Sequence, residues 1–211
     1  MCSALTAAVA MIGSHDTTRE RVTREVRTAT DHGPMSYDNA IRLRVTQASI
    51  REAQRLYPVI GMSLPRRVPA GGMRAHGHYF PPGTTVGCNP ASLHRNPDIF
   101  GTDAEEFNLD RWLRDGDGND DAVRTMERYN LTWGGGARRC PGRHLAELIV
   151  YKVIPALVKE FDIEVTMPPE EEIRFYFMAM LTGVKARFLP RKNESRRGPK
   201  NHSQFRELQK E

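Results

Sequence analysis

One segment, residues 133–142, constrains this chain more than any other. It reads Trp-Gly-Gly-Gly-Ala-Arg-Arg-Cys-Pro-Gly. Three consecutive glycines let the backbone turn sharply and approach another body closely. Cys140 comes just before a predicted helix, whose dipole and free N–H groups favour a thiolate, and Arg138 and Arg139 add positive charge beside it. The segment therefore predicts a loop that binds a flat anionic ligand from one side and presents one thiolate to it.

The alternative for this segment is a glycine-rich turn with an incidental cysteine. A lone cysteine near a helix start would favour that alternative, but the compound pattern of aromatic, glycine, arginine, cysteine and glycine argues against it. The number and spacing of the cysteines exclude two other kinds of cysteine site. Cys2, Cys88 and Cys140 are odd in number and widely spaced, which excludes a disulfide framework and a close-paired zinc site and indicates a reducing compartment.

Composition excludes several other classes of protein. Of the 211 residues 39% are hydrophobic, so wholesale disorder is excluded, and no apolar run approaches the roughly 18 residues that span a bilayer. The net charge is +5, but residues 191–211 hold seven Lys or Arg against three Glu. We therefore interpret that segment as a basic, disordered tail. The rest carries no basic stripe interleaved with aromatics, so nucleic acid is not an expected partner.

The pattern of the remaining chain predicts a mainly α fold with a small antiparallel β-sheet. Apolar residues at helical spacing predict a helix over 3–18 that continues as a highly charged helix over 17–27, and a second helix over 37–56. A long helix from Gly142 carries an apolar stripe at Leu145, Leu148, Ile149, Val153, Leu157 and Phe161. Pro/Gly turns separate the expected strands, which are 66–68, 73–76, 84–86, 163–166 and pieces of 175–189.

The loop resembles the haem-binding loop of the cytochrome P-450 haem-thiolate monooxygenases. That loop reads aromatic-x-x-Gly-x-Arg-x-Cys-x-Gly, and this chain has Trp133, Gly136, Arg138, Cys140 and Gly142 at those positions. The resemblance implies haem b as cofactor, with Cys140 as the proximal iron ligand and Arg138 as a partner of a haem propionate. Trp133 stands where the family usually has Phe and would still pack beside the sulfur.

Two further segments match the family in its order. Glu52-Ala-Gln-Arg55 gives a Glu-x-x-Arg pair on one helix face, which in isolation would be a surface ion pair. An aromatic-x-x-x-Arg-Trp segment ends at Arg111-Trp, and the resemblance joins Glu52, Arg55 and Arg111 into a buried triad. Arg66 matches the strand arginine that meets the other propionate, with Arg67 as the alternative.

The start of the chain resembles the oxygen-activating motif of the family's long distal helix. The segment Gly13-Ser-His-Asp-Thr-Thr18 aligns Asp16 with the catalytic acid and Thr17 with the alcohol that relay protons to bound dioxygen. Ser14 stands where the motif has its second glycine. Taken alone, Asp-Thr-Thr would be interpreted as a helix cap.

The resemblance implies the C-terminal portion of the cytochrome P-450 fold. Only 36 residues separate Asp16 from Glu52, fewer than in the family, so a partial gene model or an inactive remnant is the alternative to a truncated enzyme. The missing half would carry the membrane anchor and most of the substrate pocket. The expected divisions of the partial domain 1–190 are 1–27, 37–57, 58–90, 131–161 and 163–189, followed by the tail 191–211.

The implied activity is oxidation of a small apolar substrate with O₂ and NADPH. Electrons would come from NADPH-cytochrome P-450 reductase. The local sequence is most similar to fungal microsomal members such as pisatin demethylase and benzoate hydroxylase. Full-length relatives would lie on the cytosolic face of the endoplasmic reticulum, whereas this chain, without an anchor, would be cytoplasmic, and we expect it not to turn over alone.

Overall fold

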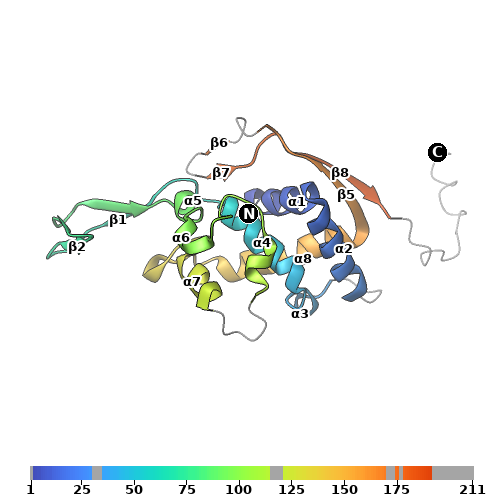
Figure 1. The fold of residues 1–211 in the computed structure, drawn as a ribbon, viewed down its shortest axis with the longest axis horizontal. Helices are drawn as coiled ribbons and strands as arrows, with labels where there is room; N and C mark the ends of the chain where they lie inside the picture. The colour runs from blue at the N-terminus through green and yellow to red at the C-terminus, as the bar shows by residue number, and fades with distance from the viewer. Residues whose placement is uncertain (1, 30–34, 115–120, 170–173, 176–177, 192–211) are drawn as a thin grey trace, which may run out of the picture.

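The computed structural model shows a helical body from which paired strands extend (Figure 1). It describes residues 2–29, 35–114, 121–169, 174–175 and 178–191, so the predicted tail lies outside the described residues except for Arg191. The α-helices described are α1 Cys2–Ser14, α2 Asp16–Ala29, α3 Tyr37–Ala40, α4 Arg44–Leu56, α5 Pro90–Leu93, α6 Pro97–Phe100, α7 Asp121–Tyr129 and α8 Arg143–Glu160, with 3-10 helices η1 Leu109–Trp112 and η2 Gly136–Arg138.

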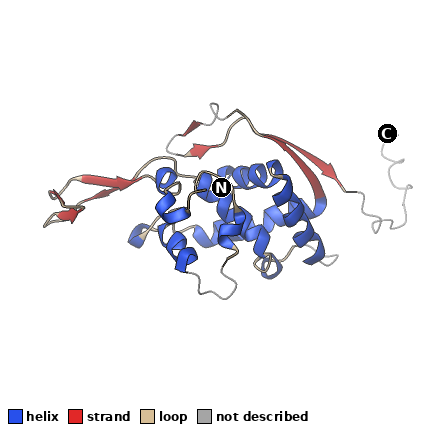
Figure 2. Cartoon of the chain, in the orientation of Figure 1, coloured by secondary structure: helices blue, strands red, loops and turns tan. Residues whose placement is uncertain are grey.

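The strands form antiparallel pairs, as Figure 2 shows. Within the described ranges there are four separate pairs and no larger sheet. The mainly α fold with antiparallel β-structure is confirmed, although the sequence did not indicate the strand at 78–80. The pairs are β1 Leu64–Arg67 with β4 Thr85–Cys88, β2 Met73–Ala75 with β3 His78–Phe80, β5 Phe161–Thr166 with β8 Lys185–Pro190, and β6 Arg174–Phe175 with β7 Ala179–Met180.

The sequence predicted one continuous helix over 3–18. The structure instead breaks this helix at His15. The His15 Nδ1 lies 2.8 Å from the carbonyl oxygen of Met11, and the Arg19 guanidinium donates to that of Gly13 at 2.9 Å. Side chains thus take over carbonyls that backbone N–H groups would bind in an unbroken helix, a recognised cause of a sharp kink. The second predicted helix is likewise interrupted, at residues 41–43 between α3 and α4.

The highly charged helix α2 buries one apolar face in the core. Val22 and Val26 are fully buried in the main core. The Glu25 carboxylate accepts from the backbone N–H groups of Val45 and Thr46, both at 2.8 Å. It thereby caps the N-terminus of α4, whose own N-cap residue makes no side-chain hydrogen bond. The charged side chain of Glu25 thus holds α2 against α4.

The face that α8 buries overlaps the predicted stripe only in part, because Leu157 and Phe161 pack half-buried against the main core while other stripe residues are exposed. Leu145 and Leu148 are 65% and 40% exposed. The buried residues are Val150, Ile154, Pro155 and Val158, and the helix packs on α1 and α2. Because α8 is apolar on more than one side, helical spacing alone allowed several faces, and packing against α1 and α2 selected one of them.

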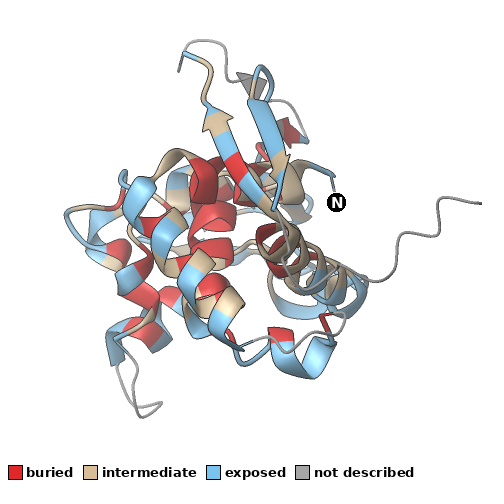
Figure 3. Cartoon of the chain, turned by 90° about the vertical axis from the view of Figure 1, so that its right-hand side faces the viewer, coloured by how far each residue is buried: buried red, intermediate tan, exposed pale blue. Residues whose placement is uncertain are grey.

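Two hydrophobic clusters hold the helical body together. The larger joins α1, α2, α4, α8 and β5, and the smaller lies between α4, α6, η1 and α7. Figure 3 shows the buried residues gathered where helices meet, whereas the strands are largely exposed. No helix among the described residues is long and apolar enough to cross a membrane.

Candidate functional site

The centre of the site's framework is the carboxylate of Glu52, on α4. One oxygen accepts from Arg55 at 2.8 Å, from Arg111 at 2.8 Å and from the backbone N–H of Asn108 at 3.0 Å. The other accepts from Arg55 at 2.9 Å and from the indole of Trp112 at 2.8 Å. The Glu52 and Arg55 side chains are 0% exposed and that of Arg111 is 3% exposed. The structure thus brings together the three predicted triad residues in a buried cluster.

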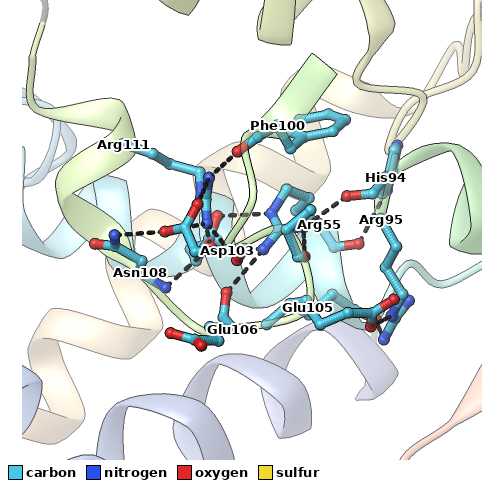
Figure 4. A network of polar contacts seen from close by, with 12 residues as sticks. Arg55, His94, Arg95, Phe100, Asp103, Glu105, Glu106, Asn108 and Arg111 are labelled. Atoms are coloured by element: carbon cyan, nitrogen blue, oxygen red, sulfur yellow. Dashed lines mark hydrogen bonds and ion pairs between the residues drawn. The ribbon is translucent and has the colours of Figure 1, made fainter. Parts of the chain in front are cut away.

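The two arginines are saturated by a second set of groups, drawn in Figure 4. Arg55 donates to the carbonyls of His94, Ala104 and Glu106, and Arg111 to that of Phe100. Asp103 pairs with Arg111 at 3.0 Å, so two arginines face two carboxylates. Burial would raise the pKa of Asp103, but the Asn108 hydrogen bond and the Arg111 charge together hold it below its usual value.

His94 connects this framework to the glycine-rich loop. Its ring is fully buried, with Nδ1 3.0 Å from the carbonyl oxygen of Arg55 and Nε2 2.7 Å from the backbone nitrogen of Leu131. Because the Leu131 N–H is a donor, Nε2 must accept, and the proton therefore resides on Nδ1. Sequence reasoning missed His94, since a histidine between Leu93 and Arg95 carries no local pattern that marks it.

The loop itself folds back on its own backbone. Gly134 and Gly136 have φ of 71° and 61°, values that favour glycine. The backbone N–H of Cys140 donates to the carbonyl of Trp133 at 2.8 Å, which closes the loop. Cys140 is exposed, and its sulfur lies 3.9 Å from the position that a Cβ on Gly142 would occupy. The thiol therefore sits beside the residue that precedes α8.

An apolar pocket of about 400 Å³ lies against this loop. Four of the predicted cofactor residues line it together: Cys140, Arg138, Trp133 and Arg66. Gly136 and Gly142 belong to the same loop but do not line the pocket. The apolar lining residues are Ala4, Val59, Ile60, Leu64, Leu131, Ala146 and Val150.

The donor set of this pocket suits a haem. It offers one thiol for the iron, two guanidiniums for carboxylates and apolar walls for a macrocycle. Within the described residues the Arg138 side chain makes no ion pair or hydrogen bond, and Arg66 donates to the carbonyl of Pro65. A guanidinium at the wall of an apolar pocket, without a partner in the described part of the chain, can bind an external anion. The described part of the chain holds no cluster of three His, Cys, Asp or Glu that would bind a metal ion by side chains alone.

Asp16 and Thr17 are not brought to this pocket. Ala4 lines it, whereas α1 ends at Ser14, roughly 15 Å farther along the helix axis. The Asp16 side chain is 79% exposed and pairs with Arg19 at 2.7 Å. The two predicted catalytic residues therefore lie apart from the predicted cofactor residues.

Comparisons with known proteins agree with these observations. A family model described as cytochrome P-450 matches residues 1–188. The chain is 56% identical over 208 residues to cytochrome P-450 monooxygenase sdnT of Sordaria araneosa, which covers 91% of this chain and 37% of that protein. It is 34% identical to cytochrome P-450 monooxygenase gsfF of Penicillium aethiopicum, over 80% of this chain and 33% of that one.

The expected likeness to pisatin demethylase is also confirmed. The protein of that name from Fusarium vanettenii is 38% identical over 153 residues, which are 71% of this chain and 27% of the relative. The chain thus spans between about a quarter and two fifths of these three curated relatives.

Proposed function

The chain belongs to the cytochrome P-450 family, and from that premise we propose that it is the haem-binding part of a haem-thiolate monooxygenase, with haem b held in the pocket beside Cys140. The reaction proposed is oxidation of a small apolar organic molecule with O₂ and NADPH. The observation that carries the proposal is the meeting of Cys140, Arg138, Arg66 and Trp133 at one apolar pocket.

Bound haem supplies the redox chemistry that activates dioxygen. The Cys140 thiolate binds the iron and donates electron density to it. Arg138 and Arg66 hold the two propionates by charge-assisted hydrogen bonds, which orient the ring. Cys140 is exposed in the chain without haem. Trp133 and the apolar walls of the pocket would pack against bound haem, and the water excluded there would strengthen each of these polar contacts.

Asp16 and Thr17 are proposed to supply protons, on the strength of the motif. The Asp16 carboxylate takes up and releases a proton, and the Thr17 hydroxyl passes it on. Because the Asp16 side chain is exposed and paired with Arg19, we expect its substitution to leave haem binding unchanged. In a full-length form of the protein, the substitution should alter the yield of product per NADPH.

The proposed electron donor is NADPH-cytochrome P-450 reductase. A polar pocket of about 510 Å³ lies on another side of the loop, where Trp133 and Gly134 meet Arg139 and Arg143. Arg143 is paired there with Glu147 at 2.8 Å and Glu127 also lines the pocket, so its charge is mixed. The reductase is therefore proposed from family membership. For the whole protein we propose the endoplasmic reticulum membrane as location, and for the chain the division into a domain over 1–190 and a tail.

The test is the absorption spectrum of the reduced chain under carbon monoxide. The 211-residue chain reconstituted with haem should show the strongly red-shifted band of thiolate ligation. Cys140→Ser should abolish that band, and Cys88→Ser, on a thiol that is also exposed, should leave it intact. A band that survives Cys140→Ser, or its absence from the parent chain, would refute the proposal.

A further inference from the structure

His94 occupies a junction between two parts of the proposed haem site. Two hydrogen bonds hold His94 to the framework. Its Nδ1–H donates to the Arg55 carbonyl, and the Arg55 guanidinium donates to the backbone carbonyl of His94 at 2.6 Å. Its remaining ring nitrogen accepts from the Leu131 N–H at 2.7 Å. Leu131 begins the segment that leads into Trp133 and Cys140. One buried ring therefore joins α4 to the start of the loop.

The other hydrogen bonds that the loop makes with described residues are local. Thr132 donates through both its N–H and its hydroxyl to Asn130, and Gly134 donates to the Leu131 carbonyl. The Cys140 N–H donates to the Trp133 carbonyl. These bonds set the shape of the loop but do not fix where it lies relative to α4. The bond from Leu131 to His94 does, because its acceptor belongs to the buried framework.

We propose that His94 is a positioning residue: its neutral ring, accepting at Nε2, fixes the start of the haem loop and through it the place of Cys140. This inference rests on the proposed function for its meaning, but the anchoring of the loop is a property of the chain without haem. Only the neutral ring can do this, since a protonated imidazole has no acceptor to offer the Leu131 N–H.

The surroundings keep the ring neutral. Burial lowers the pKa of His94 to about 4, helped by the positive charges of Arg55 and Arg95 and opposed by the Arg55 carbonyl and the Glu52 carboxylate. Arg95 is itself paired with Glu105 at 2.9 Å. An opened loop would expose the ring to water and restore its ordinary pKa, so acid should favour opening.

Two substitutions separate the ring's two hydrogen bonds. In His94→Asn the amide reaches about as far as Nδ1, so the bond to the Arg55 carbonyl is kept and the one to Leu131 is lost. In His94→Gln the amide reaches about as far as Nε2 and can accept from Leu131. We expect His94→Asn to speed hydrogen exchange of the Leu131 amide in the haem-free chain by about tenfold or more, and His94→Gln to restore most of the protection.

A spectroscopic readout accompanies the exchange measurement. In haem-loaded samples His94→Asn should lower the fraction of haem with the red-shifted thiolate band, whereas His94→Gln should preserve it. The Ala53 amide of α4 serves as the folding control and should exchange at the parent rate in both variants. Equal Leu131 protection in the parent and in His94→Asn would overturn the proposal. Because exchange is measured without haem, that result is distinct from a failure of the haem assignment.

The parent chain provides a test without any substitution. From pH 7 to pH 5, Leu131 exchange corrected for its intrinsic pH dependence should accelerate by more than about tenfold, as the opened ring takes up a proton. Ala53 should not follow, and His94→Gln should show no such acceleration. If Leu131 and Ala53 respond alike, or if His94→Gln responds as the parent does, His94 does not hold the loop.

Discussion

The Glu52 cluster and the loop that carries Cys140 are the two motif-bearing parts of this chain, and the structure completes them to different degrees. The side chains of Glu52 and Arg55 are wholly buried, and every polar atom of the Glu52 carboxylate meets protein groups. Cys140 and Arg138, in contrast, are exposed beside an apolar pocket. The cluster therefore stabilises the fold by itself, whereas the Arg138 side chain finds no hydrogen-bond or ion-pair partner among the described residues, and the proposed haem would supply one.

The largest effect is expected where the cluster is broken. Glu52→Ala leaves Arg55 and Arg111 buried without their shared carboxylate, and loss of one partner of a buried pair costs about 3–5 kcal/mol. We expect a large part of the folding stability, which is about 5–15 kcal/mol for a native domain, to disappear. Urea unfolding followed by tryptophan fluorescence measures the change.

A matched control uses an exposed glutamate in a similar pair. Glu127 bonds Arg51 with a side chain 47% exposed, and Glu127→Ala should cost less than about 1 kcal/mol. Equal costs for the two substitutions would mean that the Glu52 cluster is not the framework that its geometry indicates.

The next largest effect is expected from acid, which should lower the free energy of unfolding through protonation of His94. The folded pKa of about 4 lies below the unfolded value of about 6.5, so the unfolded chain binds the proton first. The contribution of His94 to the free energy of unfolding is fully present above pH 6.5. It falls as the pH drops toward 4 and changes no further below that, a total loss of about 3 kcal/mol. Unfolding free energies of the parent minus those of His94→Gln, across this range, isolate it. A flat difference would show that the buried ring does not titrate in this way.

The substitution Gly13→Ala tests whether helix α1 packs closely against strand β5. A Cβ there would lie 2.3 Å from Cγ2 of Val165 on β5. Although alanine is the better helix former, Gly13→Ala should destabilise by about 1–3 kcal/mol through overpacking. Adding Val165→Ala should recover part of that loss, as measured by a double-mutant cycle. If the two substitutions changed the free energy of unfolding additively, the contact between residue 13 and Val165 would be contradicted.

The smallest effect is expected at an exposed pair. Arg21 donates to both oxygens of Asp110, at 2.7 and 3.0 Å, and this bond lowers the pKa of Asp110. The Asp110 side chain is 59% exposed, so solvent screens the pair, and Asp110→Asn should cost less than about 1 kcal/mol. Thermal unfolding at low and high salt tests this, and a cost near that of Glu52→Ala would remove the contrast between buried and exposed pairs.

The sequence was sufficient where a motif contains its own partners. Glu52 and Arg55 lie one helical turn apart, so their pairing follows from spacing, and the glycines of the loop predicted its turns. It was insufficient where a contact joins distant segments. Neither the cap that Glu25 gives to α4 nor the bond from His94 to Leu131 leaves a local pattern. The exposed Leu145 shows the same limit, since an apolar helix does not reveal which face its neighbours cover.

The contrast between a self-completed cluster and a ligand-completed loop is tested most directly by hydrogen exchange with and without haem. Without haem, the amides of α4 and the Trp112 indole N–H should already exchange slowly, while the amides of residues 133–140 exchange fast. Haem should slow the loop by more than about tenfold and barely alter α4, and Cys140→Ser should reduce the slowing. A loop equally protected without haem, or an α4 protected only after haem is added, would contradict this account.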